Sequence, residues 1–231
     1  MSVQDVQELY DAGAHFACLR AHRHPSAAPY LFSTRDHNDI FNLEETKKRL
    51  DAALAFLSSA SGSGKAILFV SGKPEALAAI EGGAVRAGQP YVAGRWIGGT
   101  LTNFKNIRKR IERLLQLEKE RDSGELEKYT KRERLMIDRE IEELRGRFGG
   151  LVSMTDLPGA LFVVDSRHEE TAVAEANQLG IPVVALSSSD CDFSKVRFPI
   201  PANDTSVRSI RLIVDEIVGA VLEGKKVPSV K

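Results

Sequence analysis

Residues able to bind a metal are concentrated near the N-terminus. Three histidines and one cysteine lie within ten residues, at His15, Cys18, His22 and His24. Imidazole and thiolate are the ligands that zinc prefers, but the spacing is not that of a zinc finger, and no second Cys or His pair follows at a suitable distance. We therefore expect no structural metal here. The alternative use of this segment is a small cationic loop, in which Arg20 and Arg23 meet phosphates.

A second group of reactive side chains follows two apolar runs in the C-terminal half. Asp165 and His168 come after one run, and residues 187–190, Ser-Ser-Ser-Asp, end the next. Active sites of open α/β sheets lie at such positions. The chain has no Gly-x-Gly-x-x-Gly fingerprint for a dinucleotide and no Gly-x-Ser-x-Gly nucleophile elbow. A nucleotide-dependent enzyme is therefore the less favoured interpretation, and we expect no cofactor and no small-molecule substrate.

The segment 61–65, Ser-Gly-Ser-Gly-Lys, is similar to a phosphate loop only at first sight. It lacks the spacing of that motif, and it precedes an apolar run instead of following one. We predict a flexible linker at this position.

Residues 94–104 have the composition of an anion-binding turn. The glycine pair within this stretch allows close approach of another chain, and Thr100 or Thr102 is placed to cap the helix that follows. Free amides at a helix N-terminus, beside Arg95 and Lys105, would form a site for phosphate. The residues alone leave a second interpretation open, a tight turn whose tryptophan fills the core.

Short apolar runs alternate with helical periods along most of the chain. Runs typical of buried strands occupy residues 66–70, 91–92, 160–164 and 181–186. A shorter run at 197–200 contains proline, so we expect it at a sheet edge. Helical periods cover residues 3–10, 44–59, 75–87, 168–179 and 206–222. The alternation predicts an α/β fold, a parallel sheet with helices on both faces.

Residues 104–148 interrupt this alternation with long, highly charged helices. Apolar residues repeat every three or four positions from Phe104 to Leu114 and again from Ile137 to Phe148. A break at 122–124 between the two series predicts an antiparallel helical hairpin of the coiled-coil type, with an arm about 27 Å long that projects from the sheet. We divide the chain into a discontinuous α/β domain, residues 1–103 and 149–231, and the projecting hairpin, residues 104–148.

Composition narrows the class of protein. The 231 residues carry a formal net charge of +0, so any contact with nucleic acid has to come from local patches of cations. Two cysteines are too few for a disulfide framework, which indicates a reducing compartment. No signal peptide and no bilayer-spanning segment is visible. We expect a cytoplasmic protein with no membrane contact.

Residues 95–104, Arg-Trp-Ile-Gly-Gly-Thr-Leu-Thr-Asn-Phe, closely resemble the signature of the ribosomal protein S-two family, the second-numbered protein of the small ribosomal subunit. Further segments follow in the order of that family, at residues 13–16, 88–92, 157–165, 175–183 and 200–204. The resemblance covers nearly the whole chain. It departs in the His-rich segment, where Ala17-Cys18 stands in place of the usual Gly-His and His24-Pro25 in place of the usual Trp-Asn-Pro.

The resemblance implies a flavodoxin-like fold with an inserted helical hairpin, which marks the bacterial type. It implies a structural constituent of the small ribosomal subunit in translation, without catalytic residues. The expected partners are 16S rRNA, bound between head and body, and other small-subunit proteins, including the multidomain protein S-one. The rival interpretation is an α/β scaffold or adaptor whose hairpin docks a protein partner.

The residues that we expect to contact RNA surround the signature, the base of the hairpin and the His-rich segment. They are Arg95, Thr100, Asn103, Lys105, Arg108, Lys109, Arg20, Arg23 and Arg208. The lysines at the C-terminus, Lys225, Lys226 and Lys231, are expected to be a solvated, frayed end.

Overall fold

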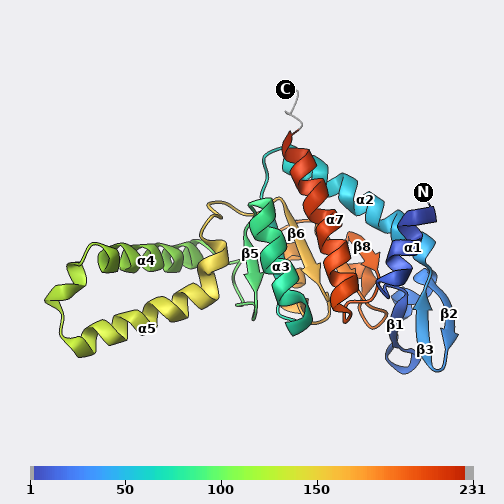
Figure 1. Cartoon of the computed structure of the whole chain (residues 1–231), viewed down its shortest axis with the longest axis horizontal. Coiled ribbons are helices and arrows are strands. Elements are labelled where there is room, and N and C mark those ends of the chain that lie inside the picture. The colour runs from blue at the N-terminus through green and yellow to red at the C-terminus, as the bar shows by residue number, and fades with distance from the viewer. Residues whose placement is uncertain (1–2, 227–231) are drawn as a thin grey trace.

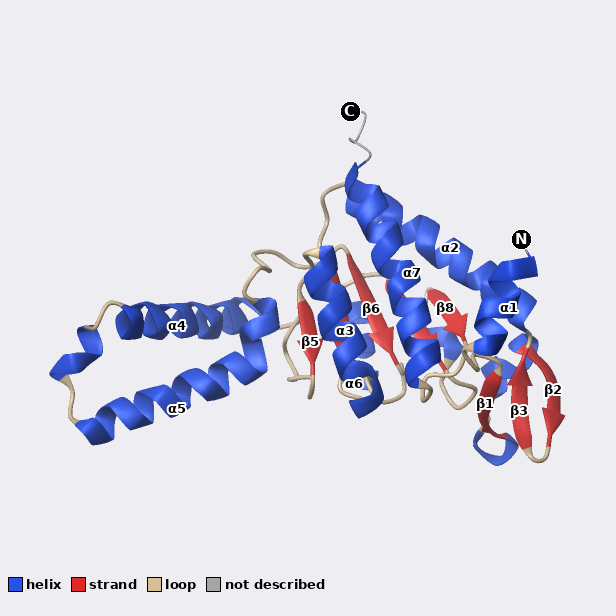
Figure 2. Ribbon diagram, in the orientation of Figure 1, coloured by secondary structure: helices blue, strands red, loops and turns tan. Residues whose placement is uncertain are grey.

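A five-stranded parallel sheet forms the centre of the molecule (Figures 1 and 2). The structure is a computed structural model that describes residues 3–226, with side chains for 6–126 and 128–226. The strands are β4 (Ile67–Ser71), β5 (Tyr91–Ala93), β6 (Ala160–Val164), β7 (Val183–Ser187) and β8 (Phe198–Pro201). Their order in the sheet is β5-β4-β6-β7-β8, so along the chain it is 2-1-3-4-5. This is the flavodoxin-like order, and it confirms the predicted fold class.

Each face of the sheet carries its own hydrophobic core. Side chains of a strand alternate between the faces, so Ile67 and Phe69 of β4 lie in one core, while Leu68 and Val70 lie in the other. The first core is covered by α2 (Leu43–Gly62), α3 (Pro74–Ala87) and α7 (Val207–Lys226). The second is covered by α6 (Glu170–Gln178) and by residues between Trp96 and Met154. Helices on both faces of the sheet were predicted. It was not predicted that side chains from the base of the hairpin would form part of the second core.

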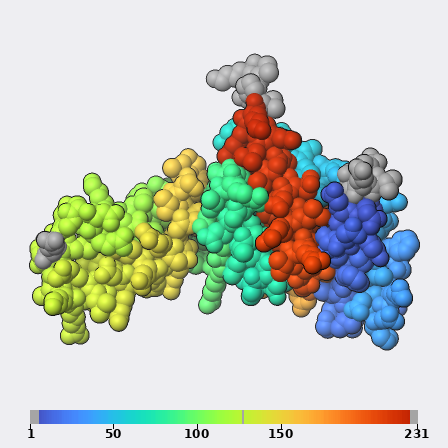
Figure 3. Space-filling model, viewed as in Figure 1, coloured from blue at the N-terminus to red at the C-terminus, as the bar shows by residue number. Residues whose placement is uncertain are grey.

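Two long helices form the arm that stands out from the sheet (Figures 1 and 3). They are α4 (Phe104–Asp122) and α5 (Lys131–Phe148), joined through the short 3-10 helix η3 (Glu125–Lys128). Leu114, Leu117 and Ile141 form a small core between the helices. Two ion pairs connect them on the outside, Arg113 with Glu140 at 3.3 Å and Arg145 with Glu118 at 2.6 Å. The apolar period of three and four thus marks the packed seam, as expected.

A small antiparallel sheet lies at the opposite end of the molecule from the arm (Figure 1). Helix α1 (Val3–Asp11) leads into β1 (Phe16–Leu19), and β2 (Leu31–Arg35) and β3 (Asn38–Phe41) complete the sheet. These strands were not predicted from the sequence. Their hairpin turns at Asp36 and His37, both with positive φ, where a glycine would have been the usual signal.

Short 3-10 helices complete the chain, at η1 (Arg20–His22), η2 (Pro25–Tyr30), η4 (Gly149–Leu151) and η5 (Phe193–Lys195). Two sequence predictions need correction. The connection before β4 is shorter than the predicted 61–65, because Ser61 and Gly62 belong to the last turn of α2 and the Ser61 hydroxyl donates to the Val221 carbonyl at 2.8 Å. Lys225 does not fray, because it lies in α7 and its ammonium donates to the Ala87 carbonyl at 2.7 Å. Lys226 also lies in α7, and Lys231 is outside the described residues.

Within residues 3–226, every helix is too short or too polar to cross a bilayer.

Candidate nucleic-acid interface

Residues 95–104, called here the signature turn, connect the end of β5 to the first residue of α4. The indole of Trp96 is 8 % exposed and packs in the second core together with Ile107 and Phe148 from the arm. The tryptophan therefore fills the core, as the second interpretation of this stretch required. It also fixes the start of the arm against the sheet, because residues before, within and after the hairpin share one hydrophobic cluster.

The prediction that the free backbone amides of the turn bind phosphate is wrong. The carboxylate of Glu175, on α6, accepts the backbone N–H groups of Gly99 at 2.7 Å and of Leu101 and Thr102 at 3.0 Å. These donors are therefore satisfied by an anion of the protein itself. The predicted threonine cap is wrong as well, since Asn103 is the N-cap residue of α4 and makes no side-chain cap hydrogen bond.

Thr100 is buried and does not reach a surface that RNA could contact. Its side chain is buried, at 2 % exposure, and its hydroxyl donates to the Ile97 carbonyl at 2.6 Å. A buried hydroxyl with a satisfied internal partner has no atom to offer to RNA. Its role is to hold the signature turn closed.

Exposed cations lie at the base of the arm, namely the predicted Arg95, Lys105 and Lys109 and also Arg110. Arg95, Lys105 and Lys109 are exposed, and none has an ion-pair partner among the described residues. Lys105 and Lys109 lie one turn apart on the same face of α4, because four residues complete about one helical turn. Asn103 is exposed beside them. Uncompensated cations with free donors are what a phosphate backbone requires, so this group is the strongest candidate interface.

Arg108 does not belong to that group, contrary to the prediction. Its guanidinium Nη1 donates to the backbone carbonyls of Val152 at 3.3 Å and Met154 at 3.2 Å, and its Nε lies 3.7 Å from the Glu112 carboxylate. The side chain ties the start of α4 to the segment that returns from α5. Arg108 is therefore a structural residue of the arm's base.

The remaining predicted contacts lie at the other end of the molecule. Arg20 and Arg23 belong to the segment after β1, and Arg208 lies in the first turn of α7, after the loop that follows β8. Four strand spacings separate β5 from β8, about 19 Å at roughly 4.8 Å each. Arg20 and Arg208 are exposed, whereas the Arg23 guanidinium lies 3.7 Å from the buried Asp39 carboxylate. The structure thus separates the nine predicted residues into two groups.

The His-rich segment distributes its side chains among different partners. The Cys18 thiol lies 3.3 Å from the Ser188 hydroxyl, and His24 Nδ1 lies 2.7 Å from the Ser26 hydroxyl. The His15 ring stacks on Tyr10 with centroids 4.5 Å apart. Burial lowers the pKa of His15 and raises that of Cys18. The prediction that these residues hold no metal together stays a prediction.

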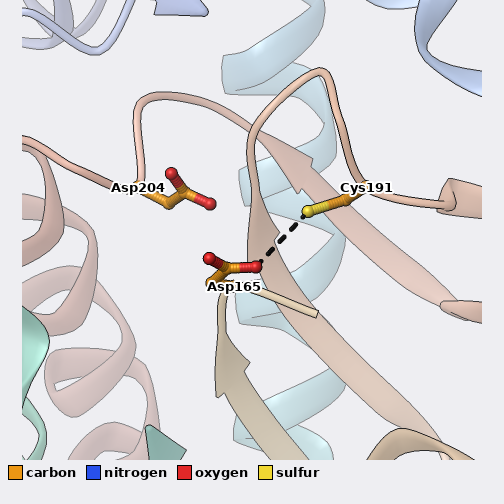
Figure 4. A group of neighbouring side chains, drawn as sticks. All are labelled: Asp165, Cys191 and Asp204. Carbon is orange, nitrogen blue, oxygen red and sulfur yellow. Dashed lines mark hydrogen bonds between the residues drawn. The ribbon is translucent and has the colours of Figure 1, made fainter. Parts of the chain in front are cut away.

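A polar cluster occupies the carboxyl ends of the central strands, where Asp165, Cys191 and Asp204 converge (Figure 4). The Lys73 ammonium lies 3.0 Å from both carboxylates. The Cys191 thiol lies 3.6 Å from Asp165 Oδ1, which also accepts the backbone N–H of His168 at 3.0 Å. Sequence reasoning singled out the segment of Asp165 but missed Lys73, which follows β4 and meets its partners only after folding.

Burial and charge set the protonation of this cluster. Burial, together with the neighbouring Asp165 charge, raises the pKa of Asp204 to about 6 in spite of Lys73. Burial alone would also raise the pKa of Asp165, but the His168 amide and the Lys73 ammonium hold it below its usual value. Burial raises the pKa of Cys191 to about 12, so the thiol is unreactive at neutral pH.

The same cluster fills the position where flavodoxin-like folds bind ligands. Lys73 follows β4 and Asp165 follows β6, and the order of the strands reverses between these two neighbours. The crevice at this reversal is the usual ligand site of open α/β sheets. Here an internal ion pair bridges it. The residues present are suited to holding the loops together.

Aromatic side chains are exposed over the small antiparallel sheet, a feature that the sequence analysis missed. Phe32 is 76 % exposed, and Tyr10 and Phe16 are each more than half exposed. They line a groove of about 590 Å³. Exposed aromatic residues of this kind are typical of surfaces that contact other proteins.

The comparisons with known proteins agree on one family. The family described as Ribosomal protein S2 matches residues 9–224. The Small ribosomal subunit protein uS2 of Roseiflexus castenholzii is 44% identical over 220 residues, 95% of this chain and 84% of the relative. The proteins of the same name from Coprothermobacter proteolyticus and Chloroflexus aggregans are 42% and 41% identical, over 98% and 97% of this chain and 84% and 94% of theirs.

Proposed function

The chain belongs to the ribosomal protein S2 family, and from this premise we propose that it binds 16S rRNA through the base of its helical arm. The family is structural and non-enzymatic, and its members named above are proteins of the small ribosomal subunit. The chain is therefore a structural ribosomal protein. What we propose in addition is which of its surfaces contact RNA and which contact protein.

The observation that carries the RNA proposal is the group of exposed, unpaired cations Arg95, Lys105 and Lys109. Elsewhere on the arm, Arg113, Arg145 and Arg147 have carboxylates within 3.3 Å. Lys119, Arg132 and Arg139 are exposed without an ion-pair partner among the described residues, so it is the rigid support of the base that sets its cations apart. A protein without net charge attracts RNA only where cations are left uncompensated. The base of the arm provides such a place on a rigid support, since the signature turn and α4 both pack in the second core. Arg20 and Arg208 form a second, smaller contact at the opposite end.

Protein neighbours are proposed for the aromatic groove over the small sheet. Phe32 and Phe16 offer apolar area, and the arginine in the lining of the groove, Arg35, lies 3.8 Å from the Asp36 carboxylate and is therefore compensated. The partner that the family resemblance suggests is the multidomain protein S-one, and we assign its docking to this face. The division of the chain into an α/β domain, 1–103 and 149–231, and an arm, 104–148, is part of the same proposal.

Sedimentation tests the proposed assembly. A tagged copy of the chain, expressed in its source cells, is expected to travel with the small subunits in a sucrose gradient of the lysate. It should leave that fraction when the RNA is digested. A chain that stays at the top of the gradient, or sediments with another complex, would favour the adaptor interpretation instead.

The same gradient separates the two contact surfaces. Phe32→Ala removes the most exposed aromatic side chain of the groove, while the cations at the base of the arm stay intact. The variant is expected to remain on the small subunit, and the amount of protein S-one on those subunits should fall several-fold. Leu135→Ala is the matched control, since it removes a half-exposed apolar side chain from the arm. Equal amounts of protein S-one with both variants would contradict the assignment of the groove.

A further inference from the structure

One buried carboxylate on α6 accepts hydrogen bonds from several donors of the signature turn. Glu175 Oε1 accepts the Trp96 indole N–H at 3.1 Å and the Gly99 N–H at 2.7 Å. Its Oε2 accepts the backbone N–H groups of Leu101 and Thr102, both at 3.0 Å, and the Thr102 hydroxyl at 3.1 Å. Five donors from a turn more than seventy residues earlier in the chain thus point at one side chain that is 7 % exposed.

We propose that Glu175 is a positioning residue for RNA binding: its carboxylate fills the anion site of the signature turn and so holds Arg95 and Lys105 in the orientation that RNA requires. The inference rests on the proposed function of that turn. It assigns to Glu175 a part in binding although the side chain is buried beneath the surface and offers RNA no atom.

The local structure explains why the turn depends on this carboxylate. Between β5 and α4 the chain has no regular secondary structure, and Gly99 adopts a φ of +88°. Within the segment, the Thr100 and Asn103 amides donate to the Ile97 and Gly99 carbonyls. The amides of Gly99, Leu101 and Thr102 instead donate to Glu175, so this part of the turn is held from outside. A carboxylate is suited to this, because ionised acceptors form stronger hydrogen bonds than neutral ones. Without it, buried N–H groups would be left without a partner.

The charge of Glu175 is consistent with this role. Burial alone would raise its pKa, but the hydrogen bonds from the Thr102 amide, the Trp96 indole and the Gly99 and Leu101 amides outweigh burial and hold the pKa below its usual value. The side chain is therefore ionised at neutral pH. The negative charge also lies near the start of α4, where the helix dipole favours an anion.

The test uses Glu175→Gln in the full-length protein, which keeps the size of the side chain and removes the charge and one acceptor. Two readouts are taken on folded protein, affinity for small-subunit RNA and the emission of Trp96, the chain's only tryptophan. We expect the affinity to fall about tenfold and the emission to shift. Arg95→Ala should cost much less affinity in the Glu175→Gln background than in the wild type, because the Arg95 side chain is already misplaced there.

Thr46→Val controls for a general loss of stability. The Thr46 hydroxyl is fully buried and donates to the Pro201 carbonyl at 2.6 Å, far along the chain from the signature turn. This variant is expected to be less stable but to keep wild-type emission and RNA affinity. If Glu175→Gln does not fold, Thr102→Val removes one donor from the exposed side of the same network. It should shift the emission and weaken binding in the same direction, by a smaller factor.

The outcomes separate this inference from the proposed function. If the wild type binds the RNA and Arg95→Ala weakens binding, but Glu175→Gln or Thr102→Val leaves affinity unchanged, the positioning role is wrong and the RNA site stands. Additive effects of Arg95→Ala and Glu175→Gln on affinity would also overturn it. If Arg95→Ala has no effect on wild-type binding, the proposed RNA site itself fails.

Discussion

Lys73→Met is expected to lower the free energy of unfolding by about 3 to 5 kcal/mol at neutral pH, because it removes the cation that lies between two largely buried carboxylates. The Lys73 ammonium lies 3.0 Å from both Asp165 and Asp204, which are 14 % and 2 % exposed at their side chains. Urea denaturation measures the decrease in stability. Lys195→Met is the matched control, since it breaks an exposed ion pair with Glu170 and should cost less than about 1 kcal/mol.

The destabilisation by Lys73→Met should be smaller in acid. The folded pKa of Asp204 is about 6, above the value near 4 expected for an unfolded aspartate. The folded state then binds a proton more readily than the unfolded state, so the stability contributed by this group is complete below about pH 4 and is lost as the pH rises through 6. Removing Lys73 raises the pKa of Asp204 further, so the pH range in which protonation of Asp204 contributes stability extends to higher pH. A destabilisation below about 1 kcal/mol, or one that grows in acid, would contradict this role of Lys73.

Gly150→Ala is expected to be the most damaging small substitution at the base of the arm. A Cβ at this position would lie 2.3 Å from the backbone oxygen of Tyr91 in β5, a clash that no side-chain movement can relieve. The return segment from α5 has to move away from the sheet, at a cost of about 3 kcal/mol. Thermal unfolding measures the stability, and limited proteolysis should cut the return segment faster.

Gly146→Ala provides a control only four residues away. This glycine lies inside α5, and a Cβ added to it would meet nothing within 4 Å. Alanine there should raise stability by about 0.5 to 1 kcal/mol, since it favours the helix. Equal effects of the two substitutions would show that the close approach of η4 to β5 does not fix the arm.

Much of the fold could be predicted because the signals are local. The strand at 160–164 is a continuous apolar run, and its predicted bounds equal those of β6. The face of α7 formed by Ile210, Ile213 and Ile217 is fully buried, as its helical period indicated. The small sheet was missed because its strands are mostly exposed and its two-residue turn lacks glycine. Local patterns of hydrophobicity carry no signal for such an element.

The candidate site was only partly predictable, for a different reason. Arg95 and Lys105 are exposed as expected, because free cations need nothing from the rest of the chain. Thr100 and Arg108 were misassigned because their partners, backbone carbonyls in a turn and in a return segment, exist only in the folded molecule. Glu175 was given no role from the sequence for a similar reason, since its donors lie more than seventy residues away. Composition shows which groups are present, and only the fold shows which of them are already satisfied.

The most direct test of the RNA assignment is filter binding of small-subunit RNA across a salt series. Removal of one cation that neutralises a phosphate should flatten the logarithmic salt dependence by about 0.7 to 0.9. Arg95→Ala and Lys105→Ala are each expected to weaken binding and to reduce the slope by about that amount. Lys119→Ala, an exposed cation in the outer half of α4, should change neither, and its helical position makes it a fair control for stability. If Lys119→Ala weakens binding as much as Arg95→Ala, the base of the arm is not the RNA anchor.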